Sequence, residues 1–310
     1  VRRKNLLWGV DTAPVRGAVF ALLENHFGVD ILDEWALRPR LAEYPVVVVP
    51  EQHALSAEMV AALKQYVRRG GKLLLTGAES LPRFGAAFLG VTRGSTKPRQ
   101  TCHVPVGDGL VPLYSERWRF VKPTTARSLG ALRRTPLWDD QILPHPAATL
   151  QRVGRGAVAY IPAAVCRDFQ HNRYPQTRQF LGAVVRRLAG PLDIEVHAPV
   201  CVDVALRRQP GRRLVHLINR ASGIPNQPPN GAVDEIPPVG PVVIRWNLPA
   251  RPRTVTAAWE KVRLRWRYAR GLLTVIVPRV HLHLAVRVDE PATELVRHGA
   301  DAGGRSRAGS

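Results

Sequence analysis

The best candidates for a binding site in this sequence are the polar residues that follow its strongest β-branched run. Pro45–Pro50 contains four consecutive valines, and Glu51, Gln52 and His53 come directly after it. Such a run is typical of a strand buried on both faces of a parallel sheet. Open α/β sheets bind ligands at the carboxyl ends of these strands. We therefore expect Glu51 and His53 to lie at a ligand site or a subunit contact, with a simple polar turn as the alternative.

A second polar group precedes the last helical pattern of the first half. Asp168, His171, Arg173 and Tyr174 lie within seven positions of one another. A carboxylate, an imidazole, a guanidinium and a phenol together are able to hydrogen-bond a sugar or a protein partner. Helix capping and an interface role explain the same residues, so both interpretations stay open.

Two histidines near the end of the chain, and tryptophans spread along the whole chain, have a similar double interpretation. His281 and His283 are two apart in a strand pattern and would share one face, a spacing that metals use. No third ligand stands nearby, so we expect a solvent-facing pair and no metal. Tryptophans are able to stack on sugars, but most should be core or interface residues. They are Trp8, Trp35, Trp118, Trp138, Trp246, Trp259 and Trp266.

The three cysteines show no metal or redox spacing. Cys102, Cys166 and Cys201 lie far apart in the chain. An odd, sparse count fits buried thiols in a reducing compartment. We therefore expect a cytoplasmic protein without a cofactor, and the short apolar runs predict no membrane span.

Alternating strand and helix patterns must position these residues in the first half. We expect strands at Asn5–Val10, Val29–Leu32, Val46–Val49, Lys72–Thr76 and Gly156–Ile161. Helices are expected at Val15–Phe27, closed by Gly28; after Ser56 as N-cap; and from Pro175 to Gly190. This order implies right-handed parallel crossovers and a doubly wound α/β sheet. We interpret Val91–Leu150, with strand-like pieces at Cys102–Val106 and Trp118–Val121, as an excursion from that sheet.

The period changes to strict alternation after Pro191. Short strands are expected around Val200–Val204, Leu214–Ile218, Val242–Trp246, Val255–Trp259, Leu272–Val277 and Val280–Val288. Turn residues separate them, which indicates an antiparallel sandwich. The predicted organisation is an α/β domain at 1–191, an all-β sandwich at 192–289 and a disordered tail at 290–310.

The net charge of +21 is the one compositional feature that points to an anionic partner. The arginines are spread along the whole chain as isolated pairs. No basic block alternates with aromatic residues, as a single-strand binder would require. We therefore expect neither nucleic acid nor a membrane as the partner.

Two stretches resemble a known family. Tyr44–Pro50, Leu55–Val60 and Tyr66–Gly77 are similar to the trimerisation domain of family-42 β-galactosidases. Arg213–Asn219, Asp234–Pro238 and Val277–His283 are similar to the C-terminal sandwich of related glycosidases, including α-L-fucosidase-like proteins. The resemblance implies a class I glutamine-amidotransferase-like, flavodoxin-like fold and a homo-oligomer, with a trimer as the family's form. In that family the catalytic carboxylates lie on a preceding TIM barrel, which this chain does not contain.

The same resemblance allows a test for amidotransferase chemistry. An active enzyme of that fold carries a nucleophilic cysteine on a sharp strand-to-helix elbow. In Gly71–Ser80 the elbow falls on Ala78 or its neighbour Glu79, and neither is a thiol. Ser80 lacks the glycines of a serine elbow and is expected to be a helix N-cap. The nucleophile is therefore lost, and no residue is predicted to be catalytic.

Four functions remain in competition. The first is a non-catalytic assembly region of a glycoside-hydrolase-like protein, which oligomerises and shapes the rim of an active site supplied elsewhere. The second is a stand-alone protein that binds a carbohydrate or another small ligand. A hydrolase with an unrecognised nucleophile and a nucleic-acid binder are the third and fourth. We expect the first, without enzyme activity of its own.

Overall fold

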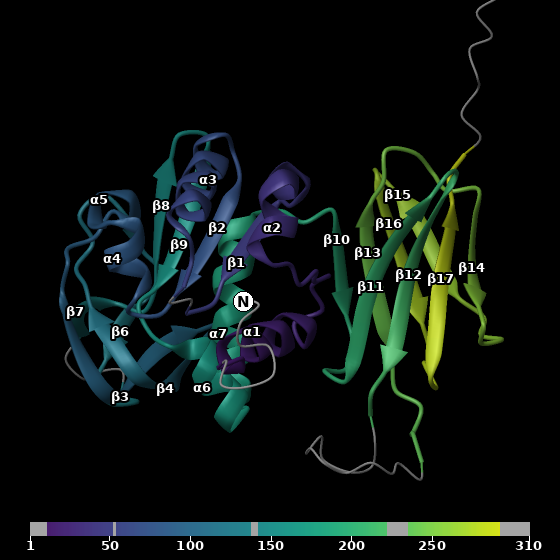
Figure 1. The fold of residues 1–310 in the computed structure, drawn as a ribbon. Helices are drawn as coiled ribbons and strands as arrows, with labels where there is room; N and C mark the ends of the chain where they lie inside the picture. The colour runs from purple at the N-terminus through teal and green to yellow at the C-terminus, as the bar shows by residue number, and fades with distance from the viewer. Residues whose placement is uncertain (1–10, 52–53, 138–141, 222–234, 292–310) are drawn as a thin grey trace, which may run out of the picture.

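The computed structural model describes residues 11–51, 54–137, 142–221 and 235–291 (Figure 1). The predicted strand Asn5–Val10, the candidate residue His53 and almost all of the predicted tail lie outside these ranges. No helix of the described ranges is long and apolar enough to cross a membrane.

A mixed five-stranded sheet forms the centre of the N-terminal part, residues 11–190. Its strands, in spatial order, are β1 (Val46–Val49), β2 (Lys72–Thr76), β9 (Gly156–Ile161), β8 (Thr149–Val153) and β5 (Arg127–Ser128). β1, β2 and β9 are parallel, whereas β8 runs antiparallel to β9 and β5 antiparallel to β8. The expectation of a parallel sheet is therefore correct for three strands and wrong for the edge. The chain enters β9 from β8 through a tight turn, and a hairpin of this kind makes antiparallel neighbours.

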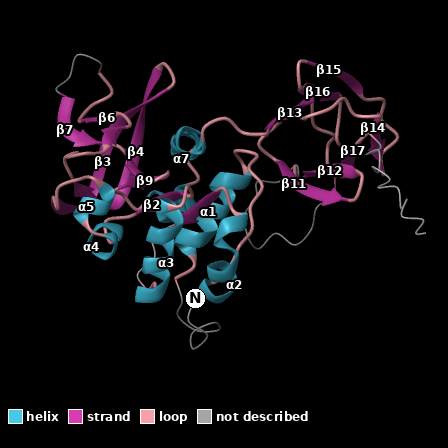
Figure 2. Ribbon diagram, turned by 90° about the horizontal axis from the view of Figure 1, so that it is seen from above, coloured by secondary structure: helices cyan, strands magenta, loops and turns pink. Residues whose placement is uncertain are grey.

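Helices cover both faces of this sheet (Figure 2). Leu74 and Ile161 pack against α1 (Ala13–Leu23), α6 (Val165–Asn172) and α7 (Pro175–Ala189). Leu73 and Leu75 point to the opposite face. The elements on that face are α2 (Glu34–Leu37), the 3₁₀ helix η2 (Arg38–Glu43), α3 (Ala57–Arg68), α4 (Ser80–Phe84) and α5 (Ala86–Leu89). Burial on both faces explains why the strand sequences are almost wholly apolar.

Local capping signals place several helix ends where the sequence predicts them. The Ser56 hydroxyl accepts the Met59 amide at 3.1 Å and begins α3. Pro175 is the first residue of α7 and Gly190 its C-cap. Ser80 is not the N-cap of α4, because Glu79 holds that position and the Ser80 hydroxyl donates instead to the Thr76 carbonyl at 2.7 Å.

The segment after α1 departs from the expectation. α1 ends at Leu23, and the amides of His26 and Phe27 bond back to Leu23 and Leu22. His26, and not the expected Gly28, adopts the left-handed conformation that closes a helix, with φ 62°. The predicted strand Val29–Leu32 does not form. The chain turns at His26 instead and runs as irregular structure to α2.

Four strands between residues 95 and 146 form a second, antiparallel sheet. Its spatial order is β4 (Gly109–Phe120), β3 (Ser95–Val106), β6 (Ala131–Arg133) and β7 (Ile142–Pro146). Both predicted strand-like pieces belong to the long β3–β4 hairpin. Its apolar face, with Cys102 and Trp118, packs into the same cluster as α6 and α7.

Two four-stranded antiparallel sheets make up the C-terminal part, residues 194–289. One contains β10 (Ile194–His197), β13 (Val242–Asn247), β16 (Leu272–Val277) and β15 (Arg265–Ala269). The other contains β11 (Val202–Gln209), β12 (Arg212–Asn219), β17 (His283–Asp289) and β14 (Thr254–Ala258). One apolar cluster fills the space between them, as the alternating pattern predicts. The sequence prediction missed β10 and β15.

α1 and α6 cross so closely that one glycine decides their packing. Gly17 lies inside α1, and a Cβ atom there would stand 1.8 Å from the Cys166 carbonyl oxygen of α6. Glycine inside a helix costs about 0.5–1 kcal/mol relative to alanine. The approach of the two helix backbones explains why glycine is nevertheless present.

We expect Gly17→Ala to lower the free energy of unfolding by about 1–3 kcal/mol, because the added methyl group forces the two helices apart. Urea denaturation followed by circular dichroism measures this change. Gly28→Ala is the matched control, since nothing lies within 4 Å of its added carbon. Equal stability of the two variants would contradict the proposed close packing.

Candidate functional site

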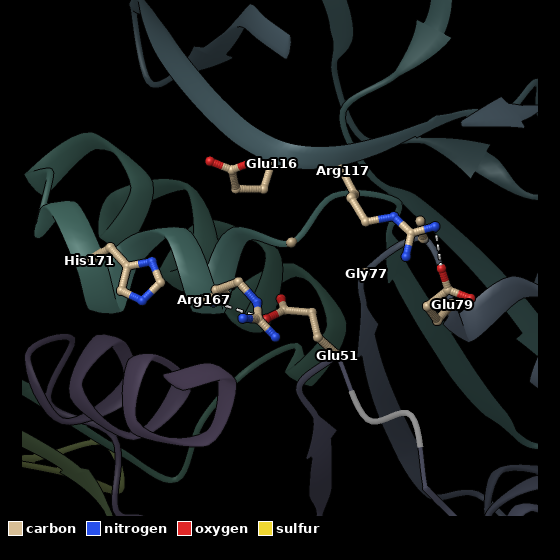
Figure 3. Close-up of a pocket in the computed structure, with 9 residues that line it drawn as sticks. Glu51, Gly77, Glu79, Glu116, Arg117, Arg167 and His171 are labelled. Carbon is tan, nitrogen blue, oxygen red and sulfur yellow. Dashed lines mark hydrogen bonds and ion pairs between the residues drawn. The ribbon is translucent and has the colours of Figure 1, made fainter. Parts of the chain in front are cut away.

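A cavity of about 480 Å³ opens at the carboxyl ends of β1, β2 and β9 (Figure 3). It is the edge of the sheet at which the sequence predicts a site. Side chains from β4, α6 and the loops after β1 and β2 line it. They are Glu51, Gly77, Ala78, Glu79, Glu116, Arg117, Ala164, Arg167 and His171.

Glu51 is the most tightly bound residue of this cavity. Its carboxylate accepts the Thr76 hydroxyl at 2.7 Å, the Cys166 amide at 3.0 Å and the Arg167 amide at 2.9 Å. Those two amides belong to the first turn of α6, whose own N-cap residue, Ala164, has no capping side chain. Glu51 therefore caps α6 from another part of the chain, and its negative charge suits the positive end of the helix.

The turn that presents Glu51 depends on two unusual backbone conformations. Glu51 itself has φ 41°, and Gly77 beside it has φ 88°. A Cβ atom on Gly77 would lie 2.7 Å from the Glu51 Cγ atom. Glycine at 77 is therefore required both by its conformation and by the space that the glutamate occupies.

Burial raises the pKa of the Glu51 carboxyl, while the Thr76 hydroxyl and the two amides act in the opposite direction. Burial and the neighbouring Glu51 raise the pKa of the Cys166 thiol well above its usual value. Its sulfur lies 3.7 Å from the Thr76 hydroxyl oxygen. A buried thiol with a raised pKa is a poor nucleophile, so Cys166 is a core residue.

The elbow after β2 has Ala78 at the position considered for a nucleophile. Gly77, Ala78 and Glu79 make the sharp turn from β2 into α4. Ala78 is 3% exposed, and its carbonyl accepts Arg119 Nε at 2.9 Å. Ser80 is also buried, with its hydroxyl bound to the backbone. Neither side chain offers a reactive atom to the cavity.

The other charges of the cavity are paired within the protein. Arg117 binds Glu79 at 2.8 Å, as Figure 3 shows, and Arg167 forms an ion pair with Asp11. Glu116 accepts the Tyr114 hydroxyl at 2.6 Å. Of the titratable side chains that line the cavity, that of His171 alone has no hydrogen bond or ion pair to the part of the chain that the structure describes.

The structure brings together only some of the predicted site residues. Glu51, Ala78 and His171 line the same cavity, and His171 lies one turn after Arg167 on α6. The sequence prediction missed Glu79, Glu116 and Arg117. The sequence marks Glu79 only as an elbow position. No local pattern marks Glu116 and Arg117, because the β3–β4 hairpin carries them to the cavity from outside the main sheet.

Arg173 and Tyr174 do not belong to this cavity. The Arg173 guanidinium lies over the Phe20 ring at 3.9 Å from its centre and pairs with Glu24 at 3.2 Å. It therefore fastens the end of α6 to α1. Tyr174 is exposed as the N-cap of α7 and is not among the residues that line the cavity.

Asp168 is not among the residues that line the cavity. It is 2% exposed, and its Oδ2 atom has no hydrogen-bond partner among the described residues. Burial raises the pKa of Asp168 to about 7, with Glu51 and Glu116 adding to the effect and the Ser115 hydroxyl opposing it. Asp168 is therefore able to change its charge near neutral pH.

No group of three or more His, Cys, Asp or Glu residues in the described ranges is arranged to hold a metal ion. Cys102, Cys166 and Cys201 are all unpaired. The chemistry that the cavity offers is therefore hydrogen bonding and ion pairing.

Residues 20–80 match the family model described as the β-galactosidase trimerisation domain. The matched segment runs from within α1 to the first residue of α4 and includes Glu51 and Ala78. It confirms the resemblance of Tyr44–Gly77 to that domain.

Several solved structures share the fold over both parts of the chain. The α-L-fucosidase isoenzyme 2 from Paenibacillus thiaminolyticus has a TM-score of 0.70 at 18% identity, covering 89% of this chain and 44% of that one. Gan42B, a GH42 β-galactosidase from G. stearothermophilus, has a TM-score of 0.53 at 17% identity, covering 88% and 35%. The β-galactosidase from Bacillus circulans sp. alkalophilus has a TM-score of 0.53 at 12% identity, covering 92% and 38%.

The chain spans less than half the length of each of these three proteins. At such identities the likeness concerns the fold. No curated protein sequence matches the chain.

We expect Glu51→Gln to lower the free energy of unfolding by about 1–3 kcal/mol, because the new amide group turns a donor toward the amides of α6 or the Thr76 hydroxyl. Chemical denaturation measures the loss. Glu79→Gln is the control within the same cavity; its ion pair with Arg117 is partly exposed and contributes less than about 1 kcal/mol. A Glu51 variant as stable as the control would refute the capping role.

Asp168 predicts a pH dependence of stability. Its folded-state pKa of about 7 lies above the unfolded value of about 3.9, so its stabilising contribution is complete below pH 4 and is lost as the pH rises through 7. Between pH 5 and 8 we expect the wild type to lose about 2–3 kcal/mol of unfolding free energy relative to Asp168→Asn. Urea titrations of both proteins at the two pH values test this, and parallel losses would exclude Asp168 as the source.

Proposed function

We propose that this chain is a non-catalytic assembly region of a glycoside-hydrolase-like protein. The observation that carries the proposal is the match of residues 20–80 to a β-galactosidase trimerisation domain. The elbow at Ala78 supports it, since no nucleophile occupies that position. The catalytic barrel would be supplied by a part of the assembly outside this chain.

The matched segment also provides a surface for self-association, which we call the Trp35 surface. Ile31 and Trp35 are 66% and 65% exposed and are the two exposed large hydrophobic residues among those described in residues 20–80. Trp35 borders a hollow of about 210 Å³ next to Arg38 and Met59. Exposed tryptophans beside a hollow are typical of residues that contribute most to protein interfaces. We infer that a second copy of the chain covers this surface.

The local structure of α2 holds Trp35 in place. The Asp33 carboxylate accepts the Ala36 amide at 2.8 Å and begins the helix. Glu34, in turn, accepts the Ser56 hydroxyl at 2.6 Å, which ties α2 to the start of α3. The indole is therefore presented from a fixed support, so little conformational entropy is lost when a partner binds.

Several finer features belong to the same proposal. The N-terminal part would be a flavodoxin-like, class I glutamine-amidotransferase-like domain at 1–191, and the C-terminal part a separate sandwich at 192–289. The cavity at Glu51 would face the rim of the active site of the assembled enzyme. Unpaired cysteines suit a cytoplasmic location.

Binding of a free small ligand in the Glu51 cavity has less support. Its carboxylates and guanidiniums already bind one another or neighbouring backbone, so a ligand would have to replace existing interactions.

We expect Trp35→Ala, alone or with Ile31→Ser, to shift the native mass of residues 1–310 toward that of a single chain, because the main apolar contact of the interface is lost. Size-exclusion chromatography with light scattering measures the mass over a range of concentrations. Trp259→Ala, which removes an equally exposed tryptophan from the C-terminal part, should leave the mass unchanged. A monomeric wild type, or an oligomer that persists in the Trp35 variant, would overturn the proposal.

A further inference from the structure

Three aromatic side chains stack on the outer face of the β11–β12–β17–β14 sheet. The Trp259 ring lies 4.7 Å from the His283 ring and 5.6 Å from the His216 ring, measured between ring centres. The two imidazoles stack on each other at 5.3 Å, and His216 Nδ1 is 3.1 Å from His283 Nε2. We call this group the Trp259 platform.

The platform was not visible in the sequence. The spacing of His281 and His283 predicted a pair on one strand face, but β17 begins only at His283, so the two do not form such a pair. The His283 side chain stacks instead on that of His216, which lies on the neighbouring strand β12. Trp259 reaches both histidines from the end of β14.

The backbone presents Trp259 in a conformation that is costly for a bulky residue. Its φ is 72°, in the left-handed region. Bulky residues rarely adopt this region, and it persists where surrounding contacts enforce it. The next residue provides such contacts: the Glu260 carboxylate accepts the His281 amide at 2.9 Å and the Leu282 amide at 3.0 Å. The indole is thus fixed in place before any ligand arrives.

One face of the fixed indole remains open. Trp259 is 68% exposed although His283 covers part of it. Leu282 and Ile218, 50% and 39% exposed, are the neighbours of His283 along the chain and across the sheet, and they extend the apolar area of the platform. A preformed and exposed tryptophan offers a large contact area at a small entropic cost.

The two imidazoles provide the polar atoms of the platform beside the indole. Burial lowers the pKa of His216, and the neighbouring His283 and Arg207 act in the same direction. His216 is therefore neutral at physiological pH. Each imidazole uses one ring nitrogen for the contact with the other, which leaves its second nitrogen to donate or accept a hydrogen bond.

We propose that the Trp259 platform binds a sugar ring of a neutral carbohydrate. A pyranose chair has an apolar face of C–H groups that matches the open indole, and a rim of hydroxyls that both donate and accept hydrogen bonds. The imidazole nitrogens beside the indole complement that rim. The same combination of an aromatic surface with a few polar groups is typical of small-ligand sites.

The size of the platform favours a sugar over other occupants. A stable protein interface requires about 20–30 residues on each side, whereas the exposed apolar area here consists of Trp259, Leu282 and Ile218. Single-stranded nucleic acid needs successive stacking surfaces along a basic groove. Trp259 is the only exposed tryptophan among the described residues of the C-terminal part.

Affinity electrophoresis of residues 1–310 through gels containing β-1,4-galactan, galactomannan or xyloglucan tests the proposal. We expect retardation on at least one polysaccharide and a loss of affinity of about ten-fold or more in Trp259→Ala. His283→Ala should bind less tightly than wild type, because it removes both the stack and one hydrogen-bonding nitrogen. Circular dichroism checks that each variant is folded.

Tyr174→Ala is the matched control, since it removes an exposed aromatic residue from the other part of the chain and should retain the affinity. Absence of retardation for the wild type on all three polysaccharides overturns the proposal. Undiminished affinity in Trp259→Ala does so as well. A native mass that falls in Trp259→Ala while retardation persists would assign the platform to a second copy. The Trp35 surface is tested by mass alone, so the two proposals fail independently.

Discussion

The N-terminal part depends on one carboxylate at the end of one helix. Glu51 follows β1, accepts a hydroxyl from the end of β2 and caps α6, which begins just after β9. The three parallel strands are thereby joined at their carboxyl edge by a single side chain. α6 in turn supports α1, whose Gly17 lies against the α6 backbone. A change at Glu51 is therefore expected to affect the sheet and two of the helices, α6 and α1, that cover one of its faces.

The same interaction explains why the cavity does not look like an active site. The first amides of α6 would otherwise be free to bind an anionic group of a ligand, but Glu51 already occupies two of them. Arg117 and Arg167 are likewise held by Glu79 and Asp11. Because these charges are paired within the protein, the carboxyl edge of the sheet is rigid. A rigid edge suits an element that positions other parts of an assembly.

Local patterns in the sequence were sufficient for β1, α3 and α7, because each carries its own period and its own cap within a few residues. Contacts between distant segments decided the rest. The antiparallel return of β8 beside β9 has no local marker, and α6 is short and capped by a residue 115 positions away. Glu51 was identified as a candidate from the strand that precedes it, but its role as a cap followed only from the fold. His216 and His283 meet only because β12 and β17 are neighbours, and the sequence separates them by 67 positions.

The order of the strands in the mixed sheet has a consequence for biosynthesis. β2 needs β9 as its second neighbour, yet about 80 residues, including the whole β3–β4 hairpin, are made between them. Until β9 and α6 leave the ribosome, β2 has an unpaired edge and Glu51 has no helix to cap. Long-range pairing of this kind slows folding and exposes strand edges to aggregation. At a synthesis rate of about 5–20 residues per second, the Val- and Leu-rich pair β1–β2 keeps this open edge for about 4–16 s.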